Sequence, residues 1–247
     1  GKTLKRNASY YWKVKIDTNK GATNWSAPAF WTTGLFNEAD WQGQWIGLDR
    51  AAPGDSETQW SRLAARYLRK EFAVKKDVKR ATVHIAGMGL YELFINGQRI
   101  GNQVLAPAPT DYRKTILYNT YDVTSLLQTE NAIGVTLGNG RFYTMRQNYK
   151  PYKIPTFGYP KLRLNLIVEY ADGSKETIAT NTSWKLTTEG PIRSNNEYDG
   201  EEYDARKELG DWTQTGYDDK GWMQAQRVSI PSGTLRAQMM PGMKVTE

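Results

Sequence analysis

Short stretches in which apolar and polar residues alternate constrain the fold of this 247-residue chain more than any other feature. The clearest is KLRLNLIVEY at 161–170, where one side carries Leu162, Leu164, Leu166 and Val168 and the other carries Arg163, Asn165 and Glu169. A period of two is that of a β-strand. No run carries the helical i, i+3, i+4, i+7 stripe over three turns. The sequence therefore predicts an all-β fold.

Turn signals separate these stretches every 8–12 residues. The strongest is Asn96-Gly97, which joins LYELFI to QRIG as a tight hairpin, and Asp172-Gly173 is another. Many short strands at this spacing are typical of antiparallel sandwiches and barrels. We predict a two-sheet antiparallel jelly roll over residues 36–232.

The two ends of the chain read as parts of other units. Residues 1–35 hold two alternating stretches, YYWKVKIDTNKG and NWSAPAFWTTG. Two strands cannot bury a core alone, so they belong to a domain with further strands or pack on the next domain. Residues 233–247 read as a linker followed by the start of another β-domain. The chain opens without methionine and stops within a strand-like run, so we expect it to be a piece of a longer protein.

Composition excludes several classes of function. The chain has no cysteine and a single histidine, His84, so a disulfide framework, a cysteine nucleophile and a histidine-pair metal site are excluded. His84 lies mid-strand among apolar neighbours and is interpreted as structural. The net charge of +7 is spread along the chain, which argues against nucleic acid. No apolar run approaches the length of about 20 residues that a membrane helix needs.

One acidic cluster, NNEYDGEEYDAR at 195–206, invites comparison with an enzyme site. Glycoside hydrolysis needs two carboxylates about 5–10 Å apart across a cleft. Pairs of acids are common in any sequence, and a solvated loop whose carboxylates hold Arg206 or backbone amides explains the cluster better than a catalytic pair does. We therefore expect no catalytic residue in this chain.

The same cluster fits a binding loop better than a catalytic one. Tyrosine rings can stack on the apolar face of a pyranose, and carboxylates can accept hydrogen bonds from its hydroxyls. Two other loops, APAPTDYRK at 106–114 and GNGRFYTMRQNYKPYKIP at 138–155, offer similar groups, although tyrosines such as Tyr143 and Tyr149 could simply cover the end of the sandwich. The candidate sugar-binding residues are Asp111, Tyr112, Asn139, Tyr198, Glu201, Tyr203 and Asp204. Glu201 and Asp204 could instead be structural partners of Arg206. Acidic oxygens could also hold calcium, but no spacing matches a calcium-loop motif, so we assign no metal site.

An ordered set of segments resembles the N-terminal region of bacterial α-L-rhamnosidases. The segments are YWKVKIDTNKGATNWSAPAFWTTGL, WQGQWIG, ARYLRKEFAVKKDVKRATVHIAGMGLYELFINGQRIGNQVLAPAPTDYRKTILYNTYDVT, NAIGVTLGNGRFY, EYDGEEYDAR, DWTQTGYDDKGW and GTLRAQMMPGMKVTE. The resemblance covers nearly the whole chain. It implies the last strands of a fibronectin-III-like or immunoglobulin-like domain, then a galactose-binding-type jelly roll, then the entry to another β-domain.

The resemblance also implies a role. Such enzymes hydrolyse terminal α-L-rhamnosyl linkages by inversion in an (α/α)6 barrel further along the chain, and nothing here reads as paired long helices. We expect a non-catalytic fragment that binds a rhamnose-containing glycan, braces the catalytic domain of the same parent, or is purely a structural scaffold. Some relatives bind L-rhamnose with calcium, often beside a tryptophan where this chain has Pro109, which weakens the case for stacking there. The family implies a periplasmic, cell-surface or secreted location.

Overall fold

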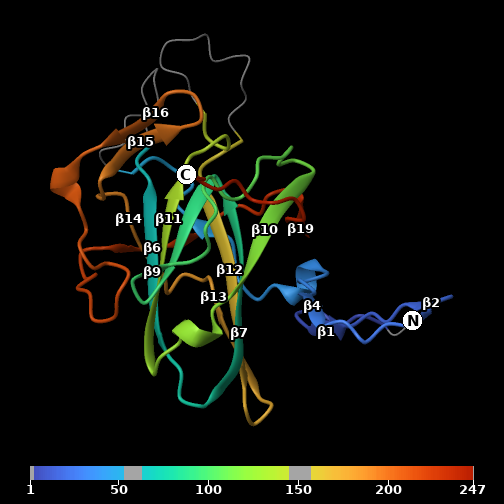
Figure 1. The fold of residues 1–247 in the computed structure, drawn as a ribbon. Helices are drawn as coiled ribbons and strands as arrows, with labels where there is room; N and C mark the ends of the chain where they lie inside the picture. Colours follow the sequence, from blue (N-terminus) through green and yellow to red (C-terminus); the bar gives the residue numbers. More distant parts are fainter. Residues whose placement is uncertain (1–2, 53–62, 145–156, 247) are drawn as a thin grey trace.

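A computed structural model describes residues 3–52, 63–144 and 157–246, and their regular elements are β-strands and single 3₁₀ turns (Figure 1). Two sheets pack face to face, and nearly all their strand pairs are antiparallel. The all-β, antiparallel two-sheet architecture predicted from the sequence is confirmed.

The first sheet has seven strands. In spatial order they are β18 (Gln226–Arg227), β5 (Ile46–Gly47), β12 (Lys161–Tyr170), β7 (Val78–Met88), β10 (Thr115–Asp122) and β19 (Thr234–Ala237), with β13 (Lys175–Ala179) also paired to β12. Gly173, at a φ of 83°, turns β12 back into β13. β19 runs parallel to β10, with Tyr118 opposite Ala237. The strand Thr234–Ala237 is therefore part of the first sheet of the sandwich.

The second sheet has six strands. In spatial order they are β17 (Met223–Gln224), β14 (Lys185–Thr187), β6 (Arg66–Ala73), β11 (Glu130–Gly138), β8 (Leu90–Ile95) and β9 (Gln98–Arg99). The β8–β9 hairpin turns at Asn96 and Gly97, which have φ values of 49° and 82°. Both residues adopt the left-handed conformation that a two-residue hairpin turn requires, so the turn is where the sequence predicts it.

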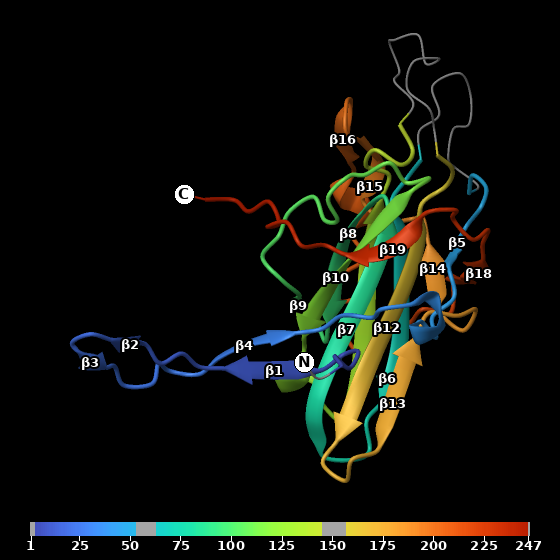
Figure 2. The ribbon, with the colours of Figure 1, turned by 90° about the vertical axis from the view of Figure 1, so that its right-hand side faces the viewer.

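Smaller elements surround the sandwich. They are the ribbon of β1 (Ser9–Trp12) with β4 (Ala29–Thr32) and β2 (Asp17–Thr18) with β3 (Gly21–Ala22), the hairpin of β15 (Ile192–Asn196) with β16 (Gly200–Tyr203), and the 3₁₀ turns η1 (Glu38–Asp40), η2 (Thr124–Leu126) and η4 (Ala205–Lys207). We call residues 9–32 the N-terminal ribbon. Figure 2 shows it projecting from the sandwich on the same side as the end of the chain.

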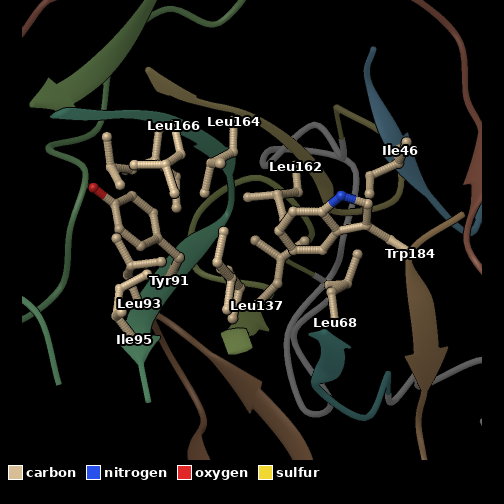
Figure 3. Close-up of a cluster of buried hydrophobic side chains, with 14 of the residues drawn as sticks. Ile46, Leu68, Tyr91, Leu93, Ile95, Leu137, Leu162, Leu164, Leu166 and Trp184 are labelled. Carbon is tan, nitrogen blue, oxygen red and sulfur yellow. The ribbon is translucent and has the colours of Figure 1, made fainter. Parts of the chain in front are cut away.

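The main core lies between the two sheets. Leu162, Leu164 and Leu166 of β12 are fully buried and pack with residues of the second sheet such as Leu93 and Leu137 (Figure 3). The apolar side of the alternating segment therefore faces the core, as the sequence predicts.

A second layer covers the outer face of the first sheet. Residues 35–45 cross that face, and Trp41 packs edge-on against Tyr118 of β10 at 5.2 Å. The polar side of β12 lies beneath this segment. Arg163 donates to the Gly43 carbonyl at 2.6 Å and Asn165 accepts from the Gly43 amide at 2.8 Å. Both side chains are buried and satisfied, so the sandwich has an inner core and a partly polar outer layer.

His84 is a structural residue, as the sequence predicts. It is fully buried on β7, where its Nδ1 lies 2.9 Å from Thr120 Oγ1 and its Nε2 lies 3.2 Å from Asn7 Oδ1. Burial, assisted by the positive charge of Arg80, lowers the pKa of His84 from 6.5 to about 4. Arg80 also binds the carbonyl of Asn7 and Ser9 Oγ at 3.1 Å, so these groups join the start of the N-terminal ribbon to the sheet.

This lowered pKa predicts a loss of stability in mild acid. The unfolded chain binds a proton at His84 near pH 6.5 and the folded chain only near pH 4, so the free energy of unfolding falls as pH drops through that window. We expect a loss of about 2 kcal/mol between pH 7.5 and pH 5, measured by urea unfolding. In the His84→Gln variant this part of the pH dependence should disappear. An equal loss in both proteins would contradict the assignment.

Candidate functional site

The seven candidate sugar-binding residues lie in three places. Asp111 and Tyr112 precede β10, Asn139 follows β11, and the other four, Tyr198, Glu201, Tyr203 and Asp204, lie on or beside the β15–β16 hairpin. Tyr149 of the second aromatic loop lies outside the described residues.

The pair before β10 is largely engaged in local structure. The Asp111 carboxylate accepts from Arg113 Nε at 3.0 Å, and this hydrogen bond holds the pKa of Asp111 below its usual value. The ring of Tyr112 is buried and packs edge-on against the stacked pair of Phe142 and Phe157, each with its ring centre 5.2 Å away. Burial raises the pKa of Tyr112 to about 12. Because only 5% of Tyr112 is exposed, its ring is not open to a sugar.

Asn139 ties the hairpin to the end of β11. Its side-chain amide donates to the Leu63 carbonyl at 2.8 Å and the Asn195 carbonyl at 2.9 Å. In return, its backbone amide donates to the side chain of Asn195 at 2.6 Å. Asn139 is buried, and its hydrogen bonds hold the β15–β16 hairpin against the end of β11.

Tyr198, at the tip of the hairpin, meets the segment after β11. Arg141 forms an ion pair with Glu197 at 3.0 Å and donates to the Tyr198 hydroxyl at 3.4 Å. The charges of Arg141 and Glu197 also act on the pKa of Tyr112, in opposite directions. Of the seven candidates, Tyr198 is the one whose side chain bonds to Arg141.

The remaining hairpin residues are held by short-range contacts. Asp204 caps η4 and pairs with Arg206 at 2.8 Å, and the hydrogen bond from Arg206 lowers the pKa of Asp204 to about 2. Tyr203 donates to Glu208. Partial desolvation and the negative charge of Glu92 raise the pKa of Glu201. Asp204 therefore takes the structural role of an Arg206 partner, whereas Glu201 does not.

A groove that the sequence analysis did not identify lies on the outer face of the second sheet. Its volume is about 490 Å³, and its lining comes from β6, the start of β14 and the loop before β17. The residues are Arg69, Lys70, Glu71, Ser183, Lys185, Gly216, Tyr217, Asp218, Asp219 and Lys220. The signal in the sequence was the run Tyr217-Asp218-Asp219-Lys220, an aromatic residue followed by charges in a loop.

Metal ligands and membrane segments were also sought in the described ranges. There, no three His, Asp or Glu side chains are grouped closely enough to hold a metal ion. None of the helical segments in the described part of the chain has the length and apolarity needed to cross a bilayer.

A family model and two curated relatives that match this chain are described as α-L-rhamnosidases or parts of them. The family model described as "Alpha-L-rhamnosidase N-terminal domain" matches residues 76–247, and that of a "Rha78A-like, N-terminal immunoglobulin domain" matches residues 1–37. An α-L-rhamnosidase from Formosa agariphila is 38% identical over 264 residues, covering 99% of this chain and 28% of that protein. A second from the same organism is 37% identical, covering 94% of this chain and 25% of that protein.

Comparison with solved structures also finds α-L-rhamnosidases. The α-L-rhamnosidase from Dictyoglumus thermophilum superposes with a TM-score of 0.88 at 39% identity, over 100% of this chain and 28% of that chain. An α-L-rhamnosidase from Streptomyces avermitilis, complexed with L-rhamnose, gives 0.89 at 22% identity over 100% of this chain and 40% of that one, a likeness of fold alone. The chain thus spans about a quarter of the curated relatives that it matches.

Proposed function

The chain belongs to the α-L-rhamnosidase N-terminal domain family, and from this premise we propose that it is a non-catalytic accessory region that braces the rest of an α-L-rhamnosidase. The parent enzyme would hydrolyse terminal α-L-rhamnosyl linkages of a glycan. Its export to the periplasm, the cell surface or the medium belongs to the same proposal and rests on the family resemblance.

The observation that carries the bracing role is a double attachment at Tyr118. The hydroxyl of Tyr118 accepts from the Leu35 amide and donates to the Leu35 carbonyl, both at 2.9 Å. The backbone carbonyl of the same residue accepts from the Gln238 amide at 2.9 Å. Both the segment that enters the sandwich and the segment that leaves it are therefore bonded to one residue of β10. Such a joint suits a region that holds its neighbours in a fixed relation.

Close packing at this joint depends on a glycine. A Cβ at Gly34 would lie 2.1 Å from the Tyr118 hydroxyl, far inside contact distance. The chain can therefore approach the buried ring only without a side chain at this position. The attachment therefore depends on the residue types at both positions, a glycine at 34 and a tyrosine at 118.

Exposed apolar surface on both attached segments supports the same role. The N-terminal ribbon exposes Tyr11, Trp12 and Phe30, and the segment after β19 exposes Met239 and Val245. Contiguous exposed apolar residues usually mark surfaces that another chain segment or domain covers. In the proposed parent, its other domains would cover them.

Removing residues 1–247 from the full-length enzyme is expected to lower the melting temperature of the remainder by several degrees. Tyr118→Phe in the full-length enzyme should also lower the melting temperature. The Leu35 amide and carbonyl lose their hydrogen-bond partner, which costs about 1–3 kcal/mol of folding free energy. Tyr203→Phe, which removes an exposed hydroxyl and its hydrogen bond to Glu208, is the control and should lower the melting temperature much less. Differential scanning calorimetry measures all three. A remainder that melts unchanged would refute bracing, and turnover of a chromogenic rhamnoside by the isolated chain would refute the non-catalytic role.

Carbohydrate binding is the second candidate, and the contact between Arg141 and Tyr198 favours it. Here a half-buried ring lies beside a charged hydrogen-bond donor at the tip of a hairpin. Titration of the chain with L-rhamnose, with and without calcium, tests this proposal against a Tyr198→Ala variant. Equal affinity in the variant and the parent sequence would remove this site from consideration.

A further inference from the structure

The groove on the outer face of the second sheet has a rigid floor. Arg69 of β6 is 1% exposed, and its guanidinium binds Asp219, Glu71 at 2.6 Å and the Trp212 carbonyl at 2.9 Å. Glu71 in turn accepts from the Gly216 amide at 2.9 Å. These bonds fasten the loop before β17 to β6. The groove is therefore formed before a ligand binds. Binding does not have to order the residues of its floor, so it loses no conformational entropy there.

Tyr217 forms a fixed aromatic wall. The Arg69 guanidinium lies 5.3 Å from its ring centre, and Trp222 packs edge-on at 5.8 Å. Two contacts at different parts of the ring fix its orientation. Tyr217 is nevertheless only partly buried and lines the groove, so part of the ring stays accessible.

Lys185 supplies a hydrogen-bond donor without a competing partner. It stands opposite Arg69 in the β14–β6 register, so both side chains lie on the same outer face. Among the described residues, Lys185 has neither an ion pair nor a side-chain hydrogen bond, whereas Arg69 is fully engaged. Asp218, which also lines the groove, is 71% exposed, lies 3.8 Å from the Lys220 ammonium and supplies an acceptor.

The charges of the lining select against a strongly ionic ligand. Four cationic and three anionic side chains surround the groove, and the most buried of them, Arg69, is neutralised by its two carboxylate partners. The groove therefore offers the ring of Tyr217, the Lys185 ammonium as a donor and the Asp218 carboxylate as an acceptor. Its volume is within the usual range of small-ligand sites. A pyranose has one apolar face and a rim of hydroxyls, and it matches this set.

We propose that the groove is a saccharide-binding subsite, with Tyr217 packing on the sugar ring and Lys185 and Asp218 bonding to its hydroxyls. The groove rests on geometry alone, whereas the choice of a saccharide rests on the proposed role in a glycoside hydrolase. The subsite is distinct from the Tyr198 group at the hairpin tip, because no residue of that group lines the groove. It is also independent of bracing, which the melting of the full-length enzyme tests.

The test is titration of the 247-residue chain with L-rhamnose and D-galactose up to 20 mM, followed by saturation-transfer NMR. At least one sugar should bind with millimolar affinity, and Lys185→Ala should weaken that affinity at least threefold with an unchanged melting temperature. Tyr217→Ala should weaken it at least tenfold. Lys15→Ala, an exposed lysine of the N-terminal ribbon, is the matched control and should leave affinity unchanged.

Three results would overturn the proposal. They are no binding of either sugar at 20 mM, binding that survives both groove substitutions, and binding that sodium acetate displaces at equal ionic strength, which would indicate an anion site. Binding that is lost in Tyr198→Ala but kept in Tyr217→Ala would place the sugar at the hairpin tip and reject the groove. Because Lys185 has no structural partner, its variant separates lost binding from lost folding.

Discussion

Trp184→Ala is expected to lower the free energy of unfolding by about 4 kcal/mol. Trp184 is the largest fully buried side chain, and it lies between the sheets beside Ile46, Leu68 and Leu162 (Figure 3). Its indole Nε1 also donates to the Ala179 carbonyl at 3.0 Å. Alanine would remove the ring from the centre of the core, open a large cavity and leave that carbonyl unpaired. Urea unfolding at pH 7.5 measures the loss.

Trp25→Ala provides a matched control. Trp25 lies on the N-terminal ribbon, is 56% exposed, and has the Lys13 ammonium 4.6 Å from its ring centre. An exposed contact of this kind contributes less than about 1 kcal/mol. Trp184→Phe should fall between the two, because it keeps part of the packing but not the hydrogen bond. Similar losses for the two alanine variants would show that the core does not lie between the sheets.

Arg69→Ala is expected to cost about 3 kcal/mol. The substitution leaves Asp219 and Glu71 without their cation and the carbonyls of Trp212 and Gln214 without their donor. The cost comes mainly from the two carbonyls at the buried arginine and from Asp219, which is 24% exposed, whereas Glu71 is 43% exposed and can be rehydrated. The loop before β17 should also loosen, which faster amide hydrogen exchange in that loop would report.

Arg206→Ala is the surface counterpart of this change. Arg206 pairs with Asp204 at 2.8 Å but is 89% exposed, and such pairs contribute at most about 1 kcal/mol. The two arginines have the same chemistry and differ in burial. If Arg206→Ala proved as destabilising as Arg69→Ala, burial would not be the reason for the effect at Arg69.

The parts of the fold that local chemistry determines were predictable from the sequence. Gly97 takes up the left-handed turn because it has no Cβ, and Asn96 does so because asparagine tolerates this conformation. The strand β12 follows from its alternation. The alternation did not reveal what covers the polar side of β12. Arg163 and Asn165 are buried beneath Gly43, a residue 120 positions earlier, and no pattern local to β12 carries that information.

The candidate site was harder still to predict, because its contacts also join residues that are distant in the sequence. Residue type predicted sugar binding at Tyr112, but the ring is buried against Phe142 and Phe157, which lie 30 or more positions further along the chain. Asp204 found a partner two residues away, a possibility that the sequence did raise. The groove was not predicted because Arg69 and Tyr217 stand far apart in sequence and meet only through the fold.

The attachment at Tyr118 has a mechanical consequence. Tension between the N-terminal ribbon and the segment beyond β19 would enter at Leu35 and leave at Gln238, and both are bonded to Tyr118. Part of the load would cross β10 at this residue, and the rest would pass through the β10–β19 ladder and the contacts of Arg80 with Asn7 and Ser9 instead of the apolar interior. Neighbouring domains could then pull against each other through this strand while the two sheets stay closed.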